Sequence, residues 1–313
     1  MRVLVAGASG AIGRRLVPML VERGHEVIGT TRGGGKESLL RGLGAEPVVM
    51  DALDAQQVRA TVMDAKPDVV IHQLTAIGDS PDLKHFDRYF AATNRLRTKG
   101  TDHLLAAAQQ AGVRRFVAQG YTGWPNPRTG GPIKDERDGL DPDPTVHSRQ
   151  SLAAMRHLEA AVTGAPMEGV VLRYGSLYGP GNAIGRGGEI LTMLHKRQLP
   201  IVGGGGGIWS HIHVDDAARA TVLATELDGI AGVYNIVDDD PAPVREWLPW
   251  LARLVGAPKP LRIPAWLARP LLGEHGVSMM TKVRGSSNAK AHQALGWTLT
   301  YPSWREGFRT GLG

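Results

Sequence analysis

The chain alternates short apolar runs with longer segments in which apolar residues recur at helical spacing. Each run is long enough for one buried strand, and the runs are Arg2–Ala6, His25–Thr31, Glu46–Asp51, Pro67–Ala76, Val113–Ala118, Val170–Tyr174 and Gly232–Val237. Strands that alternate with helices predict an α/β fold of the Rossmann type, with a doubly wound parallel sheet. Beyond Tyr178 the alternation fades and glycine-rich loops appear, which predicts a smaller C-terminal substrate lobe.

The first strand is followed at once by a glycine-rich turn. Gly7-Ala-Ser-Gly-Ala-Ile-Gly13 separates it from the helical segment Arg14–Arg23. Small residues let the backbone approach phosphate oxygens, and the free N–H groups and dipole of a helix N-terminus meet their negative charge. We therefore expect a dinucleotide diphosphate at Gly7, Ser9, Gly10, Ala11, Ile12 and Gly13. The alternative interpretation is a tight strand-to-helix turn that holds no ligand.

The end of the second strand indicates which dinucleotide binds. An acidic residue at this place accepts hydrogen bonds from the adenosine ribose and favours NAD(H). This chain has Thr31-Arg32 instead, with Lys36 close behind. Because a guanidinium suits a 2′-phosphate, we expect NADP(H) in preference to NAD(H), bound in part by Arg32 and Lys36. The alternative is that Arg32 is a solvated loop residue.

Positions near the carboxyl ends of other strands extend the expected cofactor site. Asp51 ends the third strand and is placed to meet an adenine edge, and the small-residue loop after the fourth strand is placed to pass the nicotinamide-side ribose. The further expected cofactor contacts are Asp51, Ala52, Leu74, Thr75, Ala76, Asn94 and Tyr174. We expect His72, inside an apolar strand, to be a buried and hydrogen-bonded residue instead of a catalyst.

Composition removes several classes of function. With 313 residues, 42% of them hydrophobic, the chain has ample material for a globular core. The net charge of +6 comes from scattered Lys and Arg, so we expect no nucleic-acid partner. Without cysteine, a leader or a long apolar span, we expect a cytoplasmic protein with no disulfide, thiol nucleophile or membrane contact. His211 and His213 alternate along a strand and cannot share a metal, so no metal site is expected.

Four motifs beyond the glycine turn point to one family. They are Asn94 ahead of Gly100-Thr101, Leu172-Arg-Tyr-Gly-Ser-Leu-Tyr-Gly-Pro-Gly181, His213-Val-Asp-Asp-Ala217 with Tyr234-Asn235, and the tail from Ser287 to Trp297. With them the chain resembles the extended short-chain dehydrogenase/reductase family, also called the NAD-dependent epimerase/dehydratase group. The resemblance implies a Rossmann domain at residues 1–174, to which residues 211–237 return, and a substrate lobe from residues 175–210 and 238–313. It also implies a homodimer through two long helices, near 92–111 and 151–163.

The chain departs from this family at its catalytic pair. The family's Tyr-x-x-x-Lys pair would fall at Ser151 and Met155, and a thioether carries no charge that lowers a neighbouring pKa. The family's Ser or Thr after the fifth strand falls at Tyr121, with Thr122 beside it. We expect Tyr121, Thr122 and Ser151 to form the catalytic group, with Tyr121 donating a proton to a carbonyl or alkoxide. The alternative is that Tyr121 only packs on the nicotinamide ring or points elsewhere.

A second departure concerns the substrate. Nucleotide-sugar members of the family carry an arginine where this chain has Trp209, and an indole cannot replace a charge-assisted contact to phosphate. With Trp124 and Tyr178, this favours a pocket for a small apolar or aromatic carbonyl or alcohol, although both tryptophans suit ordinary packing equally well. The sequence thus predicts an NADP(H)-dependent oxidoreductase acting on a small molecule. The alternatives are a non-redox or internally redox epimerase, dehydratase or cyclase, and a catalytically silent NADP(H)-binding protein.

Overall fold

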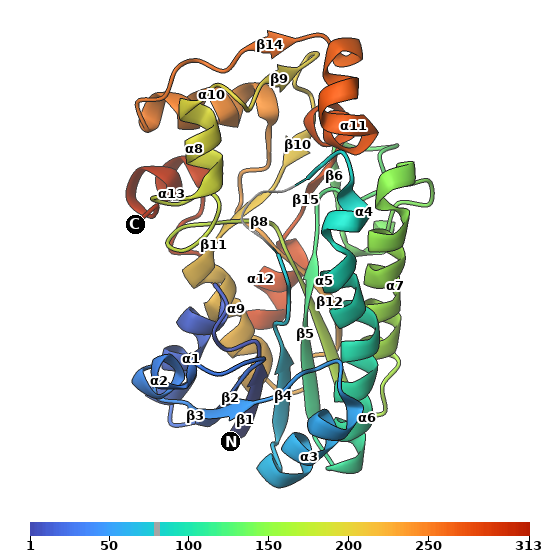
Figure 1. Cartoon of the computed structure of the whole chain (residues 1–313), viewed down its shortest axis with the longest axis vertical. Helices are drawn as coiled ribbons and strands as arrows, with labels where there is room; N and C mark the ends of the chain where they lie inside the picture. The colour runs from blue at the N-terminus through green and yellow to red at the C-terminus, as the bar shows by residue number, and fades with distance from the viewer. Residues whose placement is uncertain (78–81) are drawn as a thin grey trace.

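A seven-stranded parallel sheet forms the centre of the computed structural model, which describes residues 1–77 and 82–313 (Figure 1). Its strands in spatial order are β3 (Glu46–Val49), β2 (Glu26–Thr31), β1 (Arg2–Ala6), β4 (Val69–His72), β5 (Arg115–Tyr121), β7 (Glu168–Tyr174) and β12 (Gly232–Ile236). The strand order changes direction between β1 and β4, and ligands of such sheets bind at the carboxyl ends of the strands beside this point. The predicted Rossmann-type fold is confirmed.

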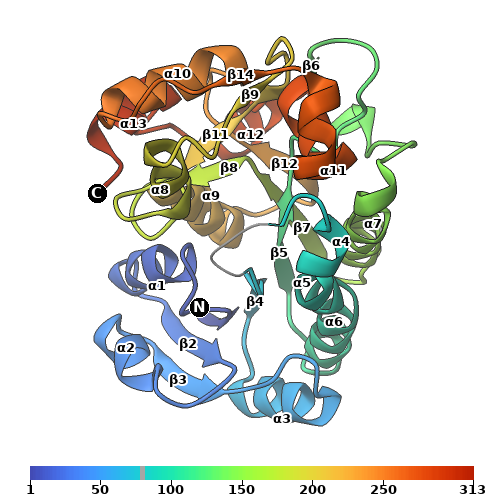
Figure 2. The same ribbon diagram turned by 45° about the horizontal axis from the view of Figure 1, so that its top comes forward.

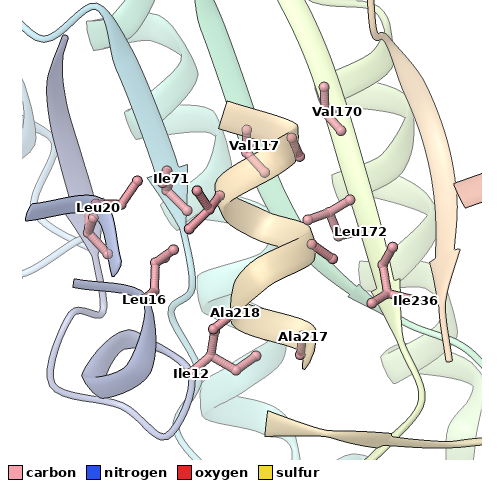
Figure 3. Close-up of a cluster of buried hydrophobic side chains, with 14 of the residues drawn as sticks. Ile12, Leu16, Leu20, Ile71, Val117, Val170, Leu172, Ala217, Ala218 and Ile236 are labelled. Carbon is pink, nitrogen blue, oxygen red and sulfur yellow. The ribbon is translucent and has the colours of Figure 1, made fainter. Parts of the chain in front are cut away.

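The sheet is buried on both faces, as a parallel sheet requires. In β1, Val3 and Val5 belong to one apolar cluster, whereas Leu4 and Ala6 belong to the other, because successive side chains point to opposite faces. The first face is covered by α1 (Gly13–Glu22), α2 (Glu37–Gly42), α9 (Val214–Glu226) and α12 (Ala289–Leu295). Figure 3 shows side chains of α1 and α9 meeting those of the central strands on this face.

The opposite face carries the helices that lead toward the candidate site. They are α3 (Ala55–Ala65), α5 (Ala91–Arg95), α6 (Thr101–Gln110) and α7 (Arg149–Thr163) (Figure 2). A π-helical turn, η1 (Leu96–Gly100), joins α5 to α6, and the short helix α4 (Phe86–Tyr89) precedes them. The family resemblance implied one long helix near residues 92–111, and the π-helical turn is the local irregularity that the sequence did not reveal.

The C-terminal lobe has its own apolar core around Trp247, Trp304 and Phe308. Its helices are α8 (Glu189–His195), α10 (Val244–Leu254), α11 (Ala265–Thr281) and α13 (Trp304–Thr310). Its short strands are β8 (Ser176–Tyr178), β9 (Ile201–Val202), β10 (Ile208–Trp209), β11 (His211–His213), β13 (Ala242–Pro243), β14 (Arg262–Ile263) and β15 (Gly285–Ser286). One more short strand, β6 (Ile133–Lys134), lies in the long loop after β5. Because β6 pairs with β15, backbone hydrogen bonds connect the lobe to the long loop after β5.

Two structural features are absent from the described residues. No helix among them is long and apolar enough to cross a membrane. In the same part of the chain, no group of three or more His, Cys, Asp or Glu side chains is arranged to hold a metal ion.

Candidate active site

The turn between β1 and α1 depends on glycine for its close contacts. Gly7 has a φ of +93°, and a Cβ there would lie 2.7 Å from the carbonyl oxygen of Gln73. A Cβ on Gly13 would lie 2.4 Å from the carbonyl oxygen of Ala8. Gly10 is exposed, and a Cβ there would meet only the Gly7 carbonyl oxygen, at 3.3 Å. The turn therefore packs tightly against β4 and α1 while its tip leaves the backbone open.

Free hydrogen-bond donors gather at the start of α1. The N-cap residue Ile12 supplies no side-chain acceptor, and the first turn holds no acidic residue. Within the described residues, the N–H groups of Ala11, Ile12 and Gly13 have no hydrogen-bond acceptor. Ser9 is half-buried, and its carbonyl oxygen accepts a hydrogen bond from Arg14 Nε at 3.0 Å. Open backbone with unpaired donors at a helix N-terminus fits the diphosphate of a dinucleotide.

The end of β2 is basic and exposed. Arg32 and Lys36 both face solvent, and neither forms an ion pair with a described residue. The nearby carboxylate of Glu37 instead accepts a hydrogen bond from the Gly35 N–H at 2.6 Å, and such backbone hydrogen bonds lower the pKa of Glu37. No acidic side chain therefore occupies the place where an adenosine ribose is recognised in NAD-specific sites.

The other expected cofactor contacts lie after β3 and β4. Asp51 is half-buried and accepts a hydrogen bond from the Leu53 N–H at 2.9 Å, a turn-stabilising role. Ala52 is buried beside the start of α6, where its carbonyl oxygen lies 3.1 Å from His103 Nδ1. The residues that follow β4 are half-buried or exposed: Leu74, Thr75 and Ala76. These contacts to a cofactor stay predictions.

Tyr121 ends β5, at the edge of the sheet that faces the lobe. Its hydroxyl lies 3.1 Å from Ser176 Oγ, the first residue of β8, and the residue as a whole is half-buried. Burial raises the pKa of Tyr121, although the hydrogen bond with Ser176 and the positive charge of Arg97 both oppose that rise. Near neutral pH the phenol is therefore protonated. Of the three residues expected to be catalytic, Tyr121 is the one that is partly accessible to solvent.

The other two residues expected to be catalytic are inaccessible. Thr122 is 1% exposed; its hydroxyl lies 2.6 Å from Ser286 Oγ and bonds Asn126, which fixes the loop after β5 to β15. Ser151 is 0% exposed; its hydroxyl donates to Asp87 Oδ1 at 2.7 Å and accepts from Asn94 Nδ2 at 3.0 Å. Both hydroxyls are thus committed to holding the scaffold around Tyr121.

Two expected tyrosines also differ from the sequence interpretation. Tyr174 is fully buried, and its hydroxyl bonds Thr221 at 2.7 Å and accepts from Gln73 at 3.0 Å, while burial raises its pKa to about 12. Tyr178 is fully buried too, edge-on to Phe308 in the core of the lobe. Their apolar surroundings place them in the scaffold behind the site, where they present no surface to a cofactor or substrate.

Of the two expected tryptophans, Trp124 lines a small cavity. It meets Phe86 edge-on, with ring centroids 5.0 Å apart, and His275 at 5.3 Å. The cavity lies between the loop after β5 and α11, and burial lowers the pKa of His275 to about 4. Trp209 instead donates from Nε1 to the Met279 carbonyl oxygen at 2.9 Å and packs on Trp247. Its contacts belong to the lobe interior.

Arg97 is a residue that the sequence interpretation missed. It lies in η1, is 7% exposed, and its charge acts on Tyr121. The signal was present: Thr93, Arg97, Thr101 and Leu104 share the spacing of one buried helix face. A charged residue in that phase is unusual and marks a buried polar site.

Comparisons with known proteins agree with this geometry. Residues 3–236 match the model of the NAD-dependent epimerase/dehydratase family. A 3-diazoavenalumate denitrifying reductase of a Streptomyces species is 44% identical over 98% of this chain and 99% of its own. A 2-alkyl-3-oxoalkanoate reductase of Stenotrophomonas maltophilia is 30% identical over 83% of this chain and 77% of its own.

Solved structures share the fold. UDP-glucose 4-epimerase of Thermotoga maritima, with UDP-glucose, has a TM-score of 0.75 at 24% identity and covers 100% of this chain and 97% of its own. A human epimerase family protein with NADPH has a TM-score of 0.75 at 20% identity, covering 99% and 98%. The chain belongs to the NAD-dependent epimerase/dehydratase family and is an enzyme of its oxidoreductase and epimerase type, with a nicotinamide dinucleotide as cofactor.

Proposed function

We propose that this enzyme is an NADPH-dependent reductase that removes nitrogen from a small aromatic compound that carries a diazonium group. The observation that carries the proposal is full-length similarity to a relative whose name states a denitrifying reduction of a diazo carboxylate. The aromatic character of the substrate is supported by the rings of Trp124, Phe86 and His275 beside Tyr121's strand. The proposed enzyme is thus still a reductase, as the sequence predicted. The group that accepts the hydride, however, is not the carbonyl that the sequence favoured.

The missing Tyr-x-x-x-Lys pair agrees with this chemistry. A carbonyl needs both a hydride and a proton, whereas an arenediazonium carbon needs a hydride alone. NADPH supplies that hydride when bound: the C–N bond breaks, a C–H bond forms, and the products are the arene, N₂ and NADP⁺. Because no proton enters the balance, the chain needs no activated phenol. Its residues position the ring and exclude water, which is a large part of catalysis in such sites.

The preference for NADPH rests on the end of β2. Arg32 and Lys36 are exposed cations with no carboxylate partner in the described part of the chain, which suits the dianionic 2′-phosphate. We expect Arg32→Glu to weaken NADPH binding by about tenfold or more, since one charge-assisted contact contributes about 1.5–3 kcal/mol. NADH affinity should change little. Fluorescence titration of both dinucleotides tests this, and equal loss of NADPH and NADH affinity would contradict a role at the 2′-phosphate.

An isotope experiment tests the reaction itself. The protein is mixed with 4-carboxybenzenediazonium and NADPH deuterated at the transferable C4 position, and benzoate is analysed by mass spectrometry. Deuterium should appear in benzoate, together with one N₂ per NADPH oxidised. Gly10→Val, whose side chain would fill the tip of the diphosphate turn, controls for non-enzymatic reduction. Rates equal to that control, or benzoate hydrogen that comes from water, would contradict the proposal.

Carbonyl reduction is the second candidate, because Tyr121 is a protonated phenol hydrogen-bonded to Ser176 at the end of β5. Similarity to a 3-oxoalkanoate reductase also favours it. The two candidates differ in their need for a proton, so turnover that depends on the Tyr121 hydroxyl supports the carbonyl reaction. An epimerase would turn over its substrate without net oxidation of NADPH. A catalytically silent binding protein would turn over neither the diazonium nor the carbonyl substrate.

We also propose a homodimer through α6 and α7. These two helices lie side by side on one face of the sheet, and His157 of α7 lies 2.7 Å from Asp102 of α6 (Figure 1). Their outward positions include the small exposed residues Ala106, Ala153 and Ala160, which allow close helix packing. Sedimentation of Ala153→Glu against the unmodified protein tests this, and an unchanged mass would contradict the interface.

A further inference from the structure

Three arginines of the described chain are almost wholly buried, and two of them are fully paired. Arg115 is 0% exposed; it bonds Glu168 at 2.6 and 2.8 Å and donates to the carbonyl oxygens of Ala224 and Thr225. Arg173 is 3% exposed and holds Glu159 through two hydrogen bonds, at 2.6 and 2.7 Å. Both follow the general rule that a buried charge is compensated by a partner.

Arg97 departs from that rule. It is 7% exposed, and within the described residues no carboxylate lies in ion-pair contact with it. Its Nη1 atom is inaccessible to solvent and has no hydrogen-bond partner in that part of the chain. The guanidinium lies 5.9 Å from the centroid of the Phe90 ring, and burial lowers its pKa to about 10. The side chain is therefore cationic at neutral pH, and no described carboxylate pairs with it.

The position of Arg97 places this cation at the active site. The carbonyl oxygen of the preceding residue, Leu96, lies 3.4 Å from His72 Nε2 at the end of β4. On the other side, Asn94 bonds Ser151 at the start of α7 and keeps a buried Oδ1 that has no partner among residues 1–77 and 82–313. The charge of Arg97 also acts on the hydroxyl of Tyr121 at the end of β5. The backbone of the π-helical turn thus lies against the end of β4, and the charge of its arginine reaches the end of β5.

We propose that Arg97 is the subsite for a carboxylate of the substrate. A planar guanidinium with free donors matches the two oxygens of a carboxylate, and desolvation strengthens such a pair. A phosphate of the dinucleotide is the other possible source of an anion. It is the less suitable one, because the donors for the diphosphate lie at the β1–α1 turn, whereas the charge of Arg97 acts on Tyr121 at the end of β5, which is separated from β1 by β4. The assignment rests on the proposed function, whose substrate would be a carboxylate.

A binding experiment tests this subsite without turnover. Cinnamate and its neutral amide, cinnamamide, are titrated into the protein saturated with NADP⁺, and heats of binding are measured. The unmodified protein should bind cinnamate about tenfold to a hundredfold more tightly than cinnamamide, the range for a charge-assisted contact. Arg97→Gln should bind the two compounds equally, and Arg97→Lys should retain part of the preference. Arg95→Gln, an exposed position in the neighbouring turn, is the matched control and should behave as the unmodified protein.

Two results would overturn the subsite. One is equal affinity of the unmodified protein for cinnamate and cinnamamide. This result does not depend on whether any variant folds. The other is an Arg97→Gln protein that keeps the preference for cinnamate but binds NADP⁺ more weakly, which assigns the cation to a cofactor phosphate. If the unmodified protein binds no dinucleotide, the proposed reductase function fails, and the same titration on the free protein still decides whether Arg97 binds a carboxylate.

Discussion

The three glycines of the diphosphate turn allow a test that separates folding from cofactor binding. In Gly10→Ala the new Cβ meets only the Gly7 carbonyl oxygen, at 3.3 Å, on an exposed tip. We expect the free energy of unfolding to change by no more than about 1 kcal/mol, because substitutions at open positions seldom exceed that. The added methyl would occupy space that the diphosphate needs, so NADPH affinity should fall by about tenfold or more, equivalent to about 1.4 kcal/mol.

Gly13→Ala perturbs the same turn from the inside. The new Cβ would lie 2.4 Å from the Ala8 carbonyl oxygen and 2.6 Å from that of Gly7, and both atoms belong to the backbone. Relief requires α1 to move away from the turn, and overpacking of this kind costs about 1–3 kcal/mol. We therefore expect this variant to lose both stability and affinity, with a lower midpoint in urea and weaker NADPH binding.

The assays are urea unfolding and fluorescence titration with NADPH, applied to both variants. Gly42→Ala is the control, because a Cβ at the end of α2 meets nothing within 4 Å. The reasoning is refuted if Gly10→Ala binds NADPH as tightly as the control does. It is refuted equally if Gly13→Ala is as stable as Gly10→Ala, since the close contacts would then have no energetic weight.

Three further substitutions give distinct outcomes. Tyr121→Phe should leave diazonium reduction within about twofold of the original rate but lower carbonyl reduction by about a hundredfold or more, as steady-state kinetics would reveal. Arg97→Met should raise the free energy of unfolding of the ligand-free protein by about 1–3 kcal/mol, whereas Arg115→Met should lower it by removing the partner of Glu168; urea unfolding without ligand separates the two. His211, whose pKa burial lowers from 6.5 to about 3, takes up a proton mainly on unfolding, so stability should fall between those pH values as acid is added. His211→Phe should reduce that slope by about 1.4 kcal/mol per pH unit, and an unchanged slope would contradict a neutral His211.

Local patterns in the sequence were sufficient for the fold and for the diphosphate turn. The apolar runs located all seven strands of the sheet, and strands buried on both faces, such as β1 and β4, have a continuous apolar signature. Gly7, Gly10 and Gly13 could be interpreted from their spacing, since their contacts involve neighbours in the chain and the adjacent strand β4. Asp54 obeys the same kind of local rule as the N-cap of α3, because its carboxylate accepts a hydrogen bond from the Gln56 N–H at 2.9 Å.

The catalytic surroundings depend on partners that are distant in sequence. Ser151 is held by Asp87, and Thr122 is held by Ser286 as well as by the nearby Asn126, so the partners that commit these hydroxyls lie mostly far away in the sequence. Trp209 looked like a pocket wall, but its indole is fixed by the Met279 carbonyl oxygen of α11. Arg97 was missed although its phase on the helix was visible, because a periodic pattern indicates burial and not the absence of a counter-ion.

The cofactor half of this enzyme is discontinuous in a way that constrains its synthesis. The last strand of the sheet in chain order is β12, at Gly232–Ile236. Trp297, still later in the chain, is buried in the same apolar cluster as α1 and α9. A ribosome must therefore make nearly the whole polypeptide before the nucleotide-binding half can close. Nascent chains that end before this tryptophan would expose the apolar surfaces of α9 and β12, and they would be substrates for chaperones and proteases.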